Sequence, residues 1–315
     1  MKQFLYENSI PFKENVLLSK KTWIKTGGIC SYWITPNTLV QLEEVCNYLY
    51  TKGIKFDIVG QTSNLFYHST CKPQVVISTT NINQSVIKGD VITCDCGCNV
   101  MHLAKKAMEA GYAGFYGLIG LPGTVASAVV NNAGCYGCSI SSMLISADVL
   151  MSDGSVRTMV KKDFGFIKRS SVFKRKEVNG VILSVNLKLK TADDVDGEYR
   201  KAERVSIDRK RNQEGYAMNL GSIYATKTRR KNIKNAISAI CVKVAGWIGY
   251  SDKAIVQKHT LLRLYGYRDL DQYISNKTIN TFIWRDICAE HKFCRYKQFM
   301  SKVYRDLKME IEERV

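Results

Sequence analysis

The stretch Gly120-Leu121-Pro122-Gly123-Thr124-Val125-Ala126-Ser127-Ala128-Val129-Val130-Asn131-Asn132-Ala133-Gly134-Cys135-Tyr136-Gly137 carries no charged side chain, although the chain as a whole is strongly basic. Small residues dominate it. They let a backbone approach a flat or charged ligand closely, and glycine adopts a positive φ where the chain turns sharply. The stretch therefore indicates a turn that lies against a ligand. Taken alone, it is equally compatible with a tight glycine-rich turn between two packed elements.

The composition is that of a globular protein. The chain has 315 residues, of which 45% are apolar and 23% charged, and this length favours two or three compact units. No apolar run reaches the roughly 18 residues of a membrane span. Residues 1–8 lack the apolar core and cleavage site of a secretory signal. We therefore expect a cytoplasmic protein without a membrane span.

The 11 cysteines are scattered and odd in number, which argues against a disulfide framework. Cys94, Cys96 and Cys98 alternate with other residues, and on a strand they would point to one face. No fourth ligand stands at a usual spacing, so no metal site is expected, although three thiolates could bind one. Cys135 and Cys138 have the spacing of a redox motif but follow a glycine turn. Both groups are expected to serve as small core residues.

The formal net charge is +18, from 46 basic and 28 acidic residues. Such a charge attracts nucleic acid, anionic membranes or phosphate-bearing small molecules. The basic residues are spread along the chain, are densest in residues 227–234, and form no zinc finger or RNA-binding signature. Nucleic-acid binding is therefore not expected, and it is kept only as a residual alternative.

The first part of the chain combines a helix, a strand and a polar turn. Apolar residues between Leu39 and Leu49 recur at helical spacing and stop at Gly53, and Phe56–Val59 has the pattern of a short buried strand. The strand leads into Gly60-Gln61-Thr62-Ser63-Asn64-Leu65. A small polar turn of this kind exposes backbone NH groups and a hydroxyl suited to a phosphate, but it is no P-loop because the lysine of that motif is missing.

The middle of the chain favours strands, and the end favours helices. A strand is expected at 91–94, a helix at 100–108, a hairpin about Ser152-Asp153-Gly154 and a half-buried strand at 181–187. This mixture predicts the α+β class. Two helical stripes follow, one from Ile233 to Val244 and one from Phe293 to Leu307, and both are expected to be packing faces.

In the order of its motifs, the chain resembles the UDP-N-acetylenolpyruvoylglucosamine reductases, also called UDP-N-acetylmuramate dehydrogenases. These are flavoenzymes of peptidoglycan precursor synthesis. Thr22–Gly28, Gly60–Leu65 and the stretch from Gly120 to Gly137 are similar to three glycine-containing blocks of that family. The resemblance implies a two-part FAD-binding domain of the vanillyl-alcohol-oxidase/PCMH type plus a smaller α+β substrate domain.

The resemblance also implies a division of the chain. Residues 1–71 would form the first FAD-binding subdomain, residues 72–195 the second, joined by the C-terminal strand 308–315, and residues 196–307 the substrate-binding domain. A monomer is expected, and its partner is a nucleotide-sugar small molecule rather than nucleic acid.

The implied FAD-binding residues come from the two turns. They are Gly60, Gln61, Thr62, Ser63, Asn64, Leu65, Gly120, Pro122, Gly123, Thr124, Ser127, Ala128, Asn132, Ala133, Gly134 and Tyr136. No metal is implied. NADPH would be the reductant, although the sequence leaves NADH open.

Three residues match the family's catalytic positions. The resemblance implies that Arg169 stabilises the enolate, that Ser222 donates a proton and that Glu310 assists that protonation. It also suggests Gln257 and Lys227 as substrate-binding residues. From the sequence alone, the first three have plainer readings, as a surface charge, a turn residue and a solvated carboxylate respectively. The implied reaction is hydride transfer from NADPH through the flavin to enolpyruvyl-UDP-N-acetylglucosamine, which gives UDP-N-acetylmuramate.

The chain departs from the family at several positions. Gln61, Thr62, Ala126 and Ser127 stand where the family has glycines, and each adds a Cβ near the expected cofactor, so a lower FAD affinity is expected. Lys168 replaces a tyrosine. The segment after Ser222 loses the family's Phe-Lys-Asn-Pro, and Gln257 replaces a glutamate. The alternatives are a flavoprotein acting on another nucleotide sugar or in surface-polysaccharide synthesis, or a catalytically impaired FAD-binding protein.

Overall fold

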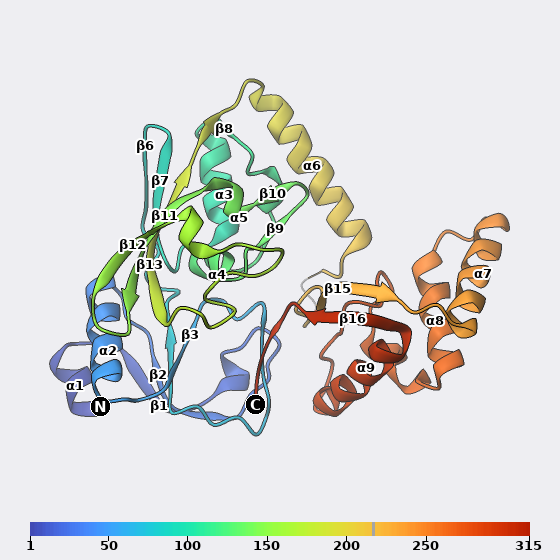
Figure 1. Ribbon diagram of the computed structural model, residues 1–315, viewed down its shortest axis with the longest axis horizontal. Coiled ribbons are helices and arrows are strands. Elements are labelled where there is room, and N and C mark those ends of the chain that lie inside the picture. The colour runs from blue at the N-terminus through green and yellow to red at the C-terminus, as the bar shows by residue number, and fades with distance from the viewer. Residues whose placement is uncertain (216–217) are drawn as a thin grey trace. The chain divides into compact units, whose positions relative to one another are not determined.

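A computed structural model describes residues 1–215 and 218–315 of the chain (Figure 1). The chain forms two compact units, each assembled from separate segments. Unit 1 comprises Met1–Lys21, Gly27–Ser63 and Cys71–Ser206, and unit 2 comprises Thr22–Thr26, Asn64–Thr70 and Ile207–Val315. Helix α6 (Val195–Asn212) contributes residues to both.

Unit 1 contains most of the strands. Its strands are β1 (Phe12–Leu17), β2 (Ile29–Ile34), β3 (Phe56–Val59), β5 (Val75–Ser78), β6 (Ser85–Lys88), β7 (Val91–Asp95), β8 (Tyr112–Ala113), β9 (Gly134–Cys135), β10 (Cys138–Ser139), β11 (Leu144–Met151), β12 (Val156–Val160), β13 (Gly180–Lys188) and β14 (Lys190–Thr191). Its helices are α1 (Lys2–Glu7), α2 (Leu39–Thr51), α3 (Val100–Glu109), α4 (Val125–Val130) and α5 (Ile140–Met143), with 3-10 turns η1 (Leu18–Lys20), η2 (Tyr116–Leu118) and η3 (Lys161–Phe164).

The first sheet of unit 1 has the order β1-β2-β5-β3. β1 pairs antiparallel with β2, whereas β2 and β3 both run parallel to β5. Helix α2 begins where the Thr38 hydroxyl accepts a hydrogen bond from the Gln41 amide at 3.2 Å, and it buries Leu42 and Leu49 in the core of this sheet. The helix expected from Leu39 and the strand expected at Phe56–Val59 are thereby confirmed, but β3 is an edge strand with Ile58 exposed, so its expected burial is wrong.

The second sheet has the order β12-β11-β13-β7-β6 and is antiparallel throughout. The hairpin expected at Ser152-Asp153-Gly154 joins β11 and β12 and is confirmed. β13 was expected to be half buried. It is instead buried over most of its length, because Ile182, Val185 and Leu187 join one hydrophobic cluster and Val181 and Leu183 join another. Its Ser184 is buried, with the hydroxyl donating to an Asp148 carboxylate oxygen at 2.8 Å.

The cysteine groups lie in the interior of unit 1. β7 ends at Asp95, so Cys96 does not continue the alternation of the strand: Cys94 and Cys98 belong to one hydrophobic cluster and Cys96 to another. The expectation that all three point to one face is therefore wrong. Cys135 and Cys138 pair across the β9–β10 hairpin, where the Cys135 thiol donates to the Gly117 carbonyl at 2.7 Å. All of these cysteines are free thiols.

Unit 2 contains the later helices and four strands. Its elements are β4 (Leu65–Tyr67), β15 (Tyr224–Arg229), α7 (Ile233–Trp247), α8 (Lys253–Tyr265), η4 (Arg268–Tyr273), α9 (Ala289–Val303), β16 (Tyr304–Met309) and β17 (Glu312–Arg314). Phe66, Phe282, Trp284 and Phe293 form a contiguous aromatic cluster at its centre, with ring centroids 4.9–5.5 Å apart. The mixture of strands and helices in the two units confirms the α+β class.

The two helical stripes of this unit have different outcomes. Phe293, Tyr296, Met300 and Val303 on α9 are fully buried, which confirms this part of the stripe as a packing face. The helix ends at Val303, so Tyr304 and Leu307 of the predicted helical stripe lie on strand β16 instead. On α7 the corresponding expectation is wrong, because the apolar residues from Ile233 to Val244 lie largely on the exposed side of the helix. The buried side of α7 carries Asn235, Ser238 and Ala245 instead.

Two strands near the C-terminus pair within unit 2. β16 pairs antiparallel with β15, and β17 pairs parallel with β4. The strand expected at 308–315 thus joins residues 65–67 rather than a strand of residues 72–195. As a division into cofactor and substrate domains, the boundaries at 71, 195 and 307 stay a prediction.

Asp269 of unit 2 gives the fold a measurable dependence on pH. Burial opposes its ionisation, but hydrogen bonds from Arg295 at 2.9 Å and Lys292 at 2.8 Å outweigh that effect and lower the pKa of Asp269 to about 2. A folded-state pKa below the ordinary 3.8 adds stability that is present above that value and is lost as the pH falls toward about 2.

We therefore expect Asp269→Asn to lower the melting temperature at neutral pH by about 2 °C, since the pair is partly exposed and screened by solvent. The difference from the parent protein should shrink below about pH 4. Thermal melts across this range measure it, with the exposed Asp193→Asn as the control. A difference that stayed constant with pH would contradict the role of the Asp269 charge.

Candidate functional site

Two glycine-containing turns of unit 1 lie directly against each other. A Cβ at Gly60 would stand 2.8 Å from Cγ2 of Thr124, and closer still to its hydroxyl, so only glycine fits there. The Gly123 amide donates a hydrogen bond to Oε1 of Gln61 at 2.9 Å. Turns separated by 62 residues in sequence are thus held in contact by one close approach and one hydrogen bond.

Several residues of the two turns have positive φ values. Gly123 has φ +123° and Gly120 has φ +79°, which glycine adopts without strain. Thr62, Asn132 and Tyr136 also have positive φ, at 57°, 44° and 50°. Such conformations are uncommon for residues with a side chain and gather at ligand-binding sites, where the surrounding structure enforces them.

Helix α4 begins at the second turn. The Ser127 hydroxyl accepts from the Thr124 amide at 3.1 Å and donates to the Thr124 carbonyl at 2.7 Å, so it closes the first turn of the helix. Ala126 is partly buried and packs against the hydrophobic core, and Ala128 is buried. Ala126 and Ser127 are two of the four positions at which the family has glycines. Their side chains contact the core and the backbone of this chain.

Asn132 joins the second turn to the loop that carries Arg169. Its Nδ2 donates to the Ile167 carbonyl at 2.8 Å, whereas its Oδ1 is buried and has no hydrogen-bond partner among the described residues. A Cβ at Gly134, two residues on, would lie 2.7 Å from Cα of Ser139, so the backbone there is tightly packed. A buried amide oxygen without a partner is unusual and points to a ligand.

Arg169 lies at the tip of a tight loop and is partly buried. Its φ is +57°, and it is flanked by reciprocal backbone hydrogen bonds between Ile167 and Ser170 at 3.1 and 3.0 Å. The buried Ser171 hydroxyl donates to the Val130 carbonyl at 2.6 Å and fastens this loop to the end of α4. The loop therefore holds the guanidinium on a backbone fixed against the second turn.

The backbone beside Ser222 is hydrogen-bonded to the backbone of Glu310 in unit 2. The Glu310 amide donates to the carbonyl of Ile223, the residue after Ser222, at 2.8 Å. Ser222 is exposed, and Glu310 is partly buried. Asn64 contacts the same segment, because its Nδ2 donates to the Glu310 carbonyl at 3.3 Å and its carbonyl accepts from the Glu312 amide at 2.9 Å. The structure thus brings the serine, the carboxylate residue and Asn64 together.

Asn280 and Trp23 support this place but have no signal in the sequence. Asn280 is buried and binds both backbone groups of Tyr224 through its side chain, at 3.2 and 2.9 Å. The Trp23 indole donates to the Asn219 carbonyl at 3.0 Å, and the Asn219 side chain accepts from the Gly221 amide at 2.9 Å. These contacts hold the backbone on both sides of Ser222. The sequence alone does not reveal this role, because Asn280 is a single residue far from Ser222 in the chain.

A second set of contacts fixes the segment that follows Glu310. The His68 ring nitrogens lie 2.8 Å from a Glu290 carboxylate oxygen and 2.6 Å from a Glu313 carboxylate oxygen. Lys297 also donates to Glu313 at 2.8 Å. Burial opposes the ionisation of Glu313, but the hydrogen bonds from Lys297 and His68 outweigh it and lower the pKa of this carboxyl. The charged cluster holds β17 in place three residues beyond Glu310.

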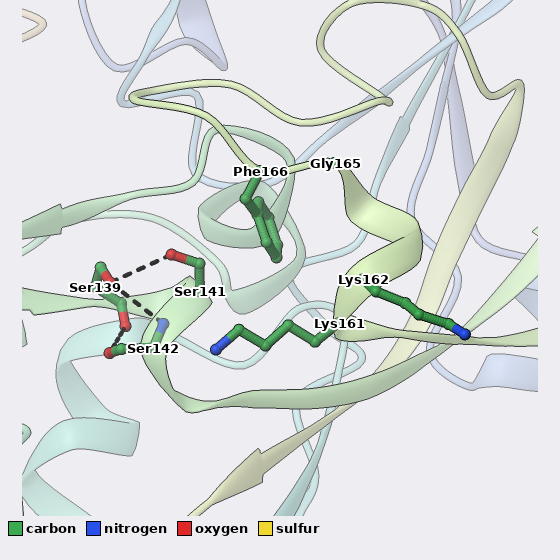
Figure 2. A pocket seen from close by; sticks show the side chains of 7 residues that line it. All are labelled: Ser139, Ser141, Ser142, Lys161, Lys162, Gly165 and Phe166. Carbon is green, nitrogen blue, oxygen red and sulfur yellow. Dashed lines mark hydrogen bonds between the residues drawn. The ribbon is translucent and has the colours of Figure 1, made fainter.

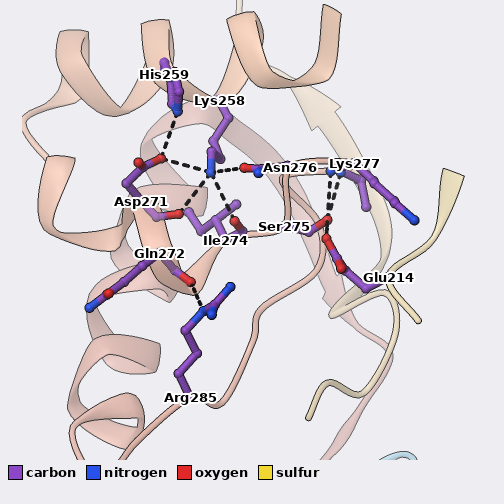
Figure 3. A network of polar contacts seen from close by, with 11 residues as sticks. Glu214, Lys258, His259, Asp271, Gln272, Ile274, Ser275, Asn276, Lys277 and Arg285 are labelled. Carbon is purple, nitrogen blue, oxygen red and sulfur yellow. Dashed lines mark hydrogen bonds and ion pairs between the residues drawn. The ribbon is translucent and has the colours of Figure 1, made fainter. Parts of the chain in front are cut away.

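Lys227 and Gln257, the two residues predicted to bind substrate, also belong to unit 2. Lys227 is exposed on β15, and Gln257 is partly buried on α8. Gln257 precedes Lys258, which is buried and lies 2.9 Å from an Asp271 carboxylate oxygen and 3.0 Å from the Asp271 carbonyl (Figure 3). His259 approaches the same carboxylate at 3.1 Å. This network fastens α8 to the turn η4, and the Gln257 side chain makes no hydrogen bond to another described residue.

A shallow pocket of about 670 Å³ lies in unit 1 (Figure 2). It is lined by Ser139, Ser141, Ser142, Lys161, Lys162, Gly165 and Phe166. The three serines bond one another and their own backbone, and none of the sequence-predicted site residues lines the pocket. Within the described ranges, no group of three His, Cys, Asp or Glu residues is arranged to hold a metal ion. The pocket thus borders the second turn, because Ser139 pairs with Gly134, but it does not include the predicted site residues.

Comparison with known proteins gives these turns a context. A family model described as an FAD binding domain matches residues 31–159, which include both turns. The UDP-N-acetylenolpyruvoylglucosamine reductase of Caldicellulosiruptor bescii is 30% identical over 259 residues, which cover 81% of this chain and 80% of that protein. The reductase of the same name from Enterococcus faecalis is 30% identical over 182 residues, 58% of this chain and 60% of that protein.

The fold agrees with these relatives. The crystal structure of the UDP-N-acetylenolpyruvylglucosamine reductase from Thermus caldophilus aligns with a TM-score of 0.69 at 21% identity, over 97% of this chain and all of that one. This confirms the fold expected from the sequence, a two-part FAD-binding domain with a smaller α+β domain. The chain therefore belongs to the UDP-N-acetylenolpyruvoylglucosamine reductase family, a family of FAD-binding oxidoreductases.

Proposed function

We propose that the protein is an FAD-dependent reductase that transfers a hydride from NADPH to the enolpyruvyl group of UDP-N-acetylglucosamine enolpyruvate. The product would be UDP-N-acetylmuramate, a peptidoglycan precursor. The observation that carries the proposal is the direct contact of the two turns, with Gly60 against Thr124 and Gln61 bound to Gly123, within the part of the chain that matches an FAD binding domain. The long match to a reductase supports the reaction.

The residues of the two turns fit a dinucleotide cofactor. Gly120 and Gly123 adopt positive φ, which glycine takes without strain, and the buried Oδ1 of Asn132 is available as an acceptor. We propose the FAD-binding residues of the two turns, from Gly60 to Leu65 and from Gly120 to Tyr136, as the cofactor site. When bound, FAD would supply the hydride transfer, which amino-acid side chains cannot perform.

The chain's own residues would then supply binding, charge and a proton. Arg169, fixed on its strained loop, would stabilise the negative charge that develops on the substrate carboxylate, because a guanidinium is always protonated and presents a planar set of donors. The exposed Ser222 hydroxyl would donate a proton to the carbanion-like carbon, and Glu310 would assist that transfer. Lys227 and Gln257 would bind the nucleotide sugar.

Gln61 gives the lower FAD affinity expected from the sequence a physical cause. Its amide oxygen already accepts the Gly123 hydrogen bond, so that backbone donor is not open to a phosphate oxygen. We expect Gln61→Gly to bind FAD several-fold more tightly, on the order of the tenfold that 1.4 kcal/mol gives. Titration of the apoprotein with FAD, followed by flavin fluorescence, measures the change.

A surface substitution of the same kind controls this measurement. Gln3 is exposed on α1 and hydrogen-bonds only Glu7, so Gln3→Gly should leave FAD affinity unchanged. If Gln61→Gly instead weakened FAD binding, the side chain would be part of the cofactor site and not a competitor for it.

A spectroscopic experiment tests the proposed reaction. Purified protein should show the absorbance of bound flavin, alone or after addition of FAD, and anaerobic NADPH should bleach it. Enolpyruvyl-UDP-N-acetylglucosamine should then restore the absorbance. Bleaching without recovery would favour a reductase of another nucleotide sugar, as the altered residues 224–227 and Gln257 allow. No flavin binding under any condition would overturn both. The cytoplasmic location and the monomeric state expected from the sequence stay predictions.

A further inference from the structure

Helix α7 turns its apolar side outward. Ile233, Ile237, Ile240, Val244 and Trp247 follow one another at intervals of four and three residues, which places them along one side of the helix. These five residues are called the outer face of α7. Their exposed fractions run from 39% for Ile237 to 84% for Trp247, and Ile248 just beyond the helix is 78% exposed.

The inner side of α7 explains why the helix is turned this way. Asn235 is buried there, and its Nδ2 donates to the Arg230 and Val303 carbonyls at 2.7 and 2.9 Å. Its amide donates to the Asn232 side chain, which caps the helix, at 2.9 Å. Rotating the outer face inward would break these bonds. The polar side is therefore locked inside.

The outer face takes no part in the core of its unit. The large hydrophobic cluster of unit 2 draws on α8, η4, α9 and strands β15 and β16, and none of its members belongs to α7. Figure 1 shows α7 lying alongside α8. A run of large exposed apolar side chains on one helix face marks an interaction surface, because scattered single residues would suffice for an ordinary surface.

The charges on α7 and directly beside it are mainly basic, although the exposed Asp252 lies in the turn that follows the helix. α7 itself carries Lys234 and Lys243 and no acidic residue. Lys231 precedes the helix, and the Lys253 side chain reaches back over its last turn, 3.2 Å from where a Cβ of Gly246 would stand. None of these four lysines pairs with a carboxylate of the described residues. Two copies of this face would bring like charges together, whereas an anionic surface would be attracted.

We propose that the outer face of α7 docks on an anionic lipid surface. The helix would lie in the plane of the membrane surface. Ile240 and Trp247 would insert between the headgroups and the acyl chains, and the lysines would contact the anionic headgroups. Trp247 suits the boundary, where its amphipathic ring is favoured. The protein needs no spanning segment for this: among the described residues, no helix is long and apolar enough to cross a bilayer. The inference is independent of the proposed reaction.

Flotation of the full-length protein with vesicles tests the docking. At low salt we expect binding to phosphatidylcholine vesicles that contain roughly 30% phosphatidylglycerol, and little binding to phosphatidylcholine alone. Ile240→Asp should weaken the binding at least about tenfold. The substitution removes an apolar side chain that would insert into the membrane, and it adds a negative charge that the anionic lipids repel. Ile287, 99% exposed outside α7, supplies the matched control: Ile287→Asp should bind like the parent.

Trp247 provides a second, local readout. Trp33 and Trp284 are buried and Trp23 is partly buried, so a blue shift of tryptophan emission on adding anionic vesicles should come from Trp247. Trp247→Phe should abolish the shift while most of the binding remains. Absence of binding to the anionic vesicles, or binding equally strong in Ile240→Asp, would overturn the proposal. A concentration-dependent dimer in sedimentation experiments, abolished by Ile240→Asp and accompanied by no vesicle binding, would assign the face to a second copy of the chain instead.

Discussion

Ser222→Ala is expected to slow reoxidation of the reduced flavin by the enolpyruvyl substrate by about 10² to 10⁴-fold, the usual contribution of a positioned proton donor. Reduction of the flavin by NADPH should be unchanged, because no proton is delivered to a substrate carbon in that half-reaction. The structure gives the prediction its basis: Ser222 is exposed and lies one residue from Ile223, whose carbonyl binds the Glu310 amide. Stopped-flow absorbance measures the two half-reactions separately.

Two further variants sharpen the result. Ser222→Cys retains a weak acid at the same place and should recover part of the lost rate. Ser251, another exposed serine of unit 2, is the matched control, and Ser251→Ala should leave both half-reactions as they are. An equal loss in both half-reactions of Ser222→Ala would mean that the serine shapes the turn after Gly221 and takes no part in protonation.

Gly60→Ala is expected to produce protein that is purified without flavin. The added methyl group would meet Thr124 at less than the contact distance of any real pair, so the two turns would have to separate. Overpacking of this kind costs about 1 to 3 kcal/mol, which corresponds to a loss of FAD affinity of roughly fivefold to 150-fold. The flavin content on purification and the dissociation constant from an FAD titration both report it.

Gly215 offers the matched control, because a Cβ there meets nothing within 4 Å and its φ is not in the left-handed region. Gly215→Ala should retain its flavin and its melting temperature. If Gly60→Ala bound FAD as the parent does, the contact between the turns would have no bearing on the cofactor, and the proposed site would be lost. Because circular dichroism reports folding separately, a misfolded variant would be recognised as such.

Much of the fold follows from patterns that are local in sequence. The apolar period of α2 and its stop at Gly53, and the Asp-Gly turn between β11 and β12, each depend on residues within one element or one turn. That the run at 120–137 faces a ligand stays a prediction, but its sharp turns, with positive φ at Gly120 and Gly123, were predicted from the glycines themselves. These features were predictable because no distant residue is needed to produce them.

Features that depend on distant partners were not predictable. The direction of α7 is set by Asn235 binding the Val303 carbonyl, a contact across 68 residues that hydrophobic periodicity does not reveal. β13 has an alternating sequence, yet hydrophobic clusters bury it on both faces. The support of Ser222 by Asn280 is likewise a tertiary contact. For α7 and for Ser222, a buried asparagine determines the arrangement.

The pairing of β17 with β4 has a consequence for how the chain is made. The two strands lie about 245 residues apart in sequence, since Leu65 of β4 pairs with Glu312 of β17. While the ribosome is still adding the last helices, residues 65–67 have no strand to pair with, and a parallel pair of such high contact order forms slowly. A nascent chain halted before residue 312 should therefore retain a protease-sensitive segment around Leu65, and protection there should appear only as synthesis reaches the last strand.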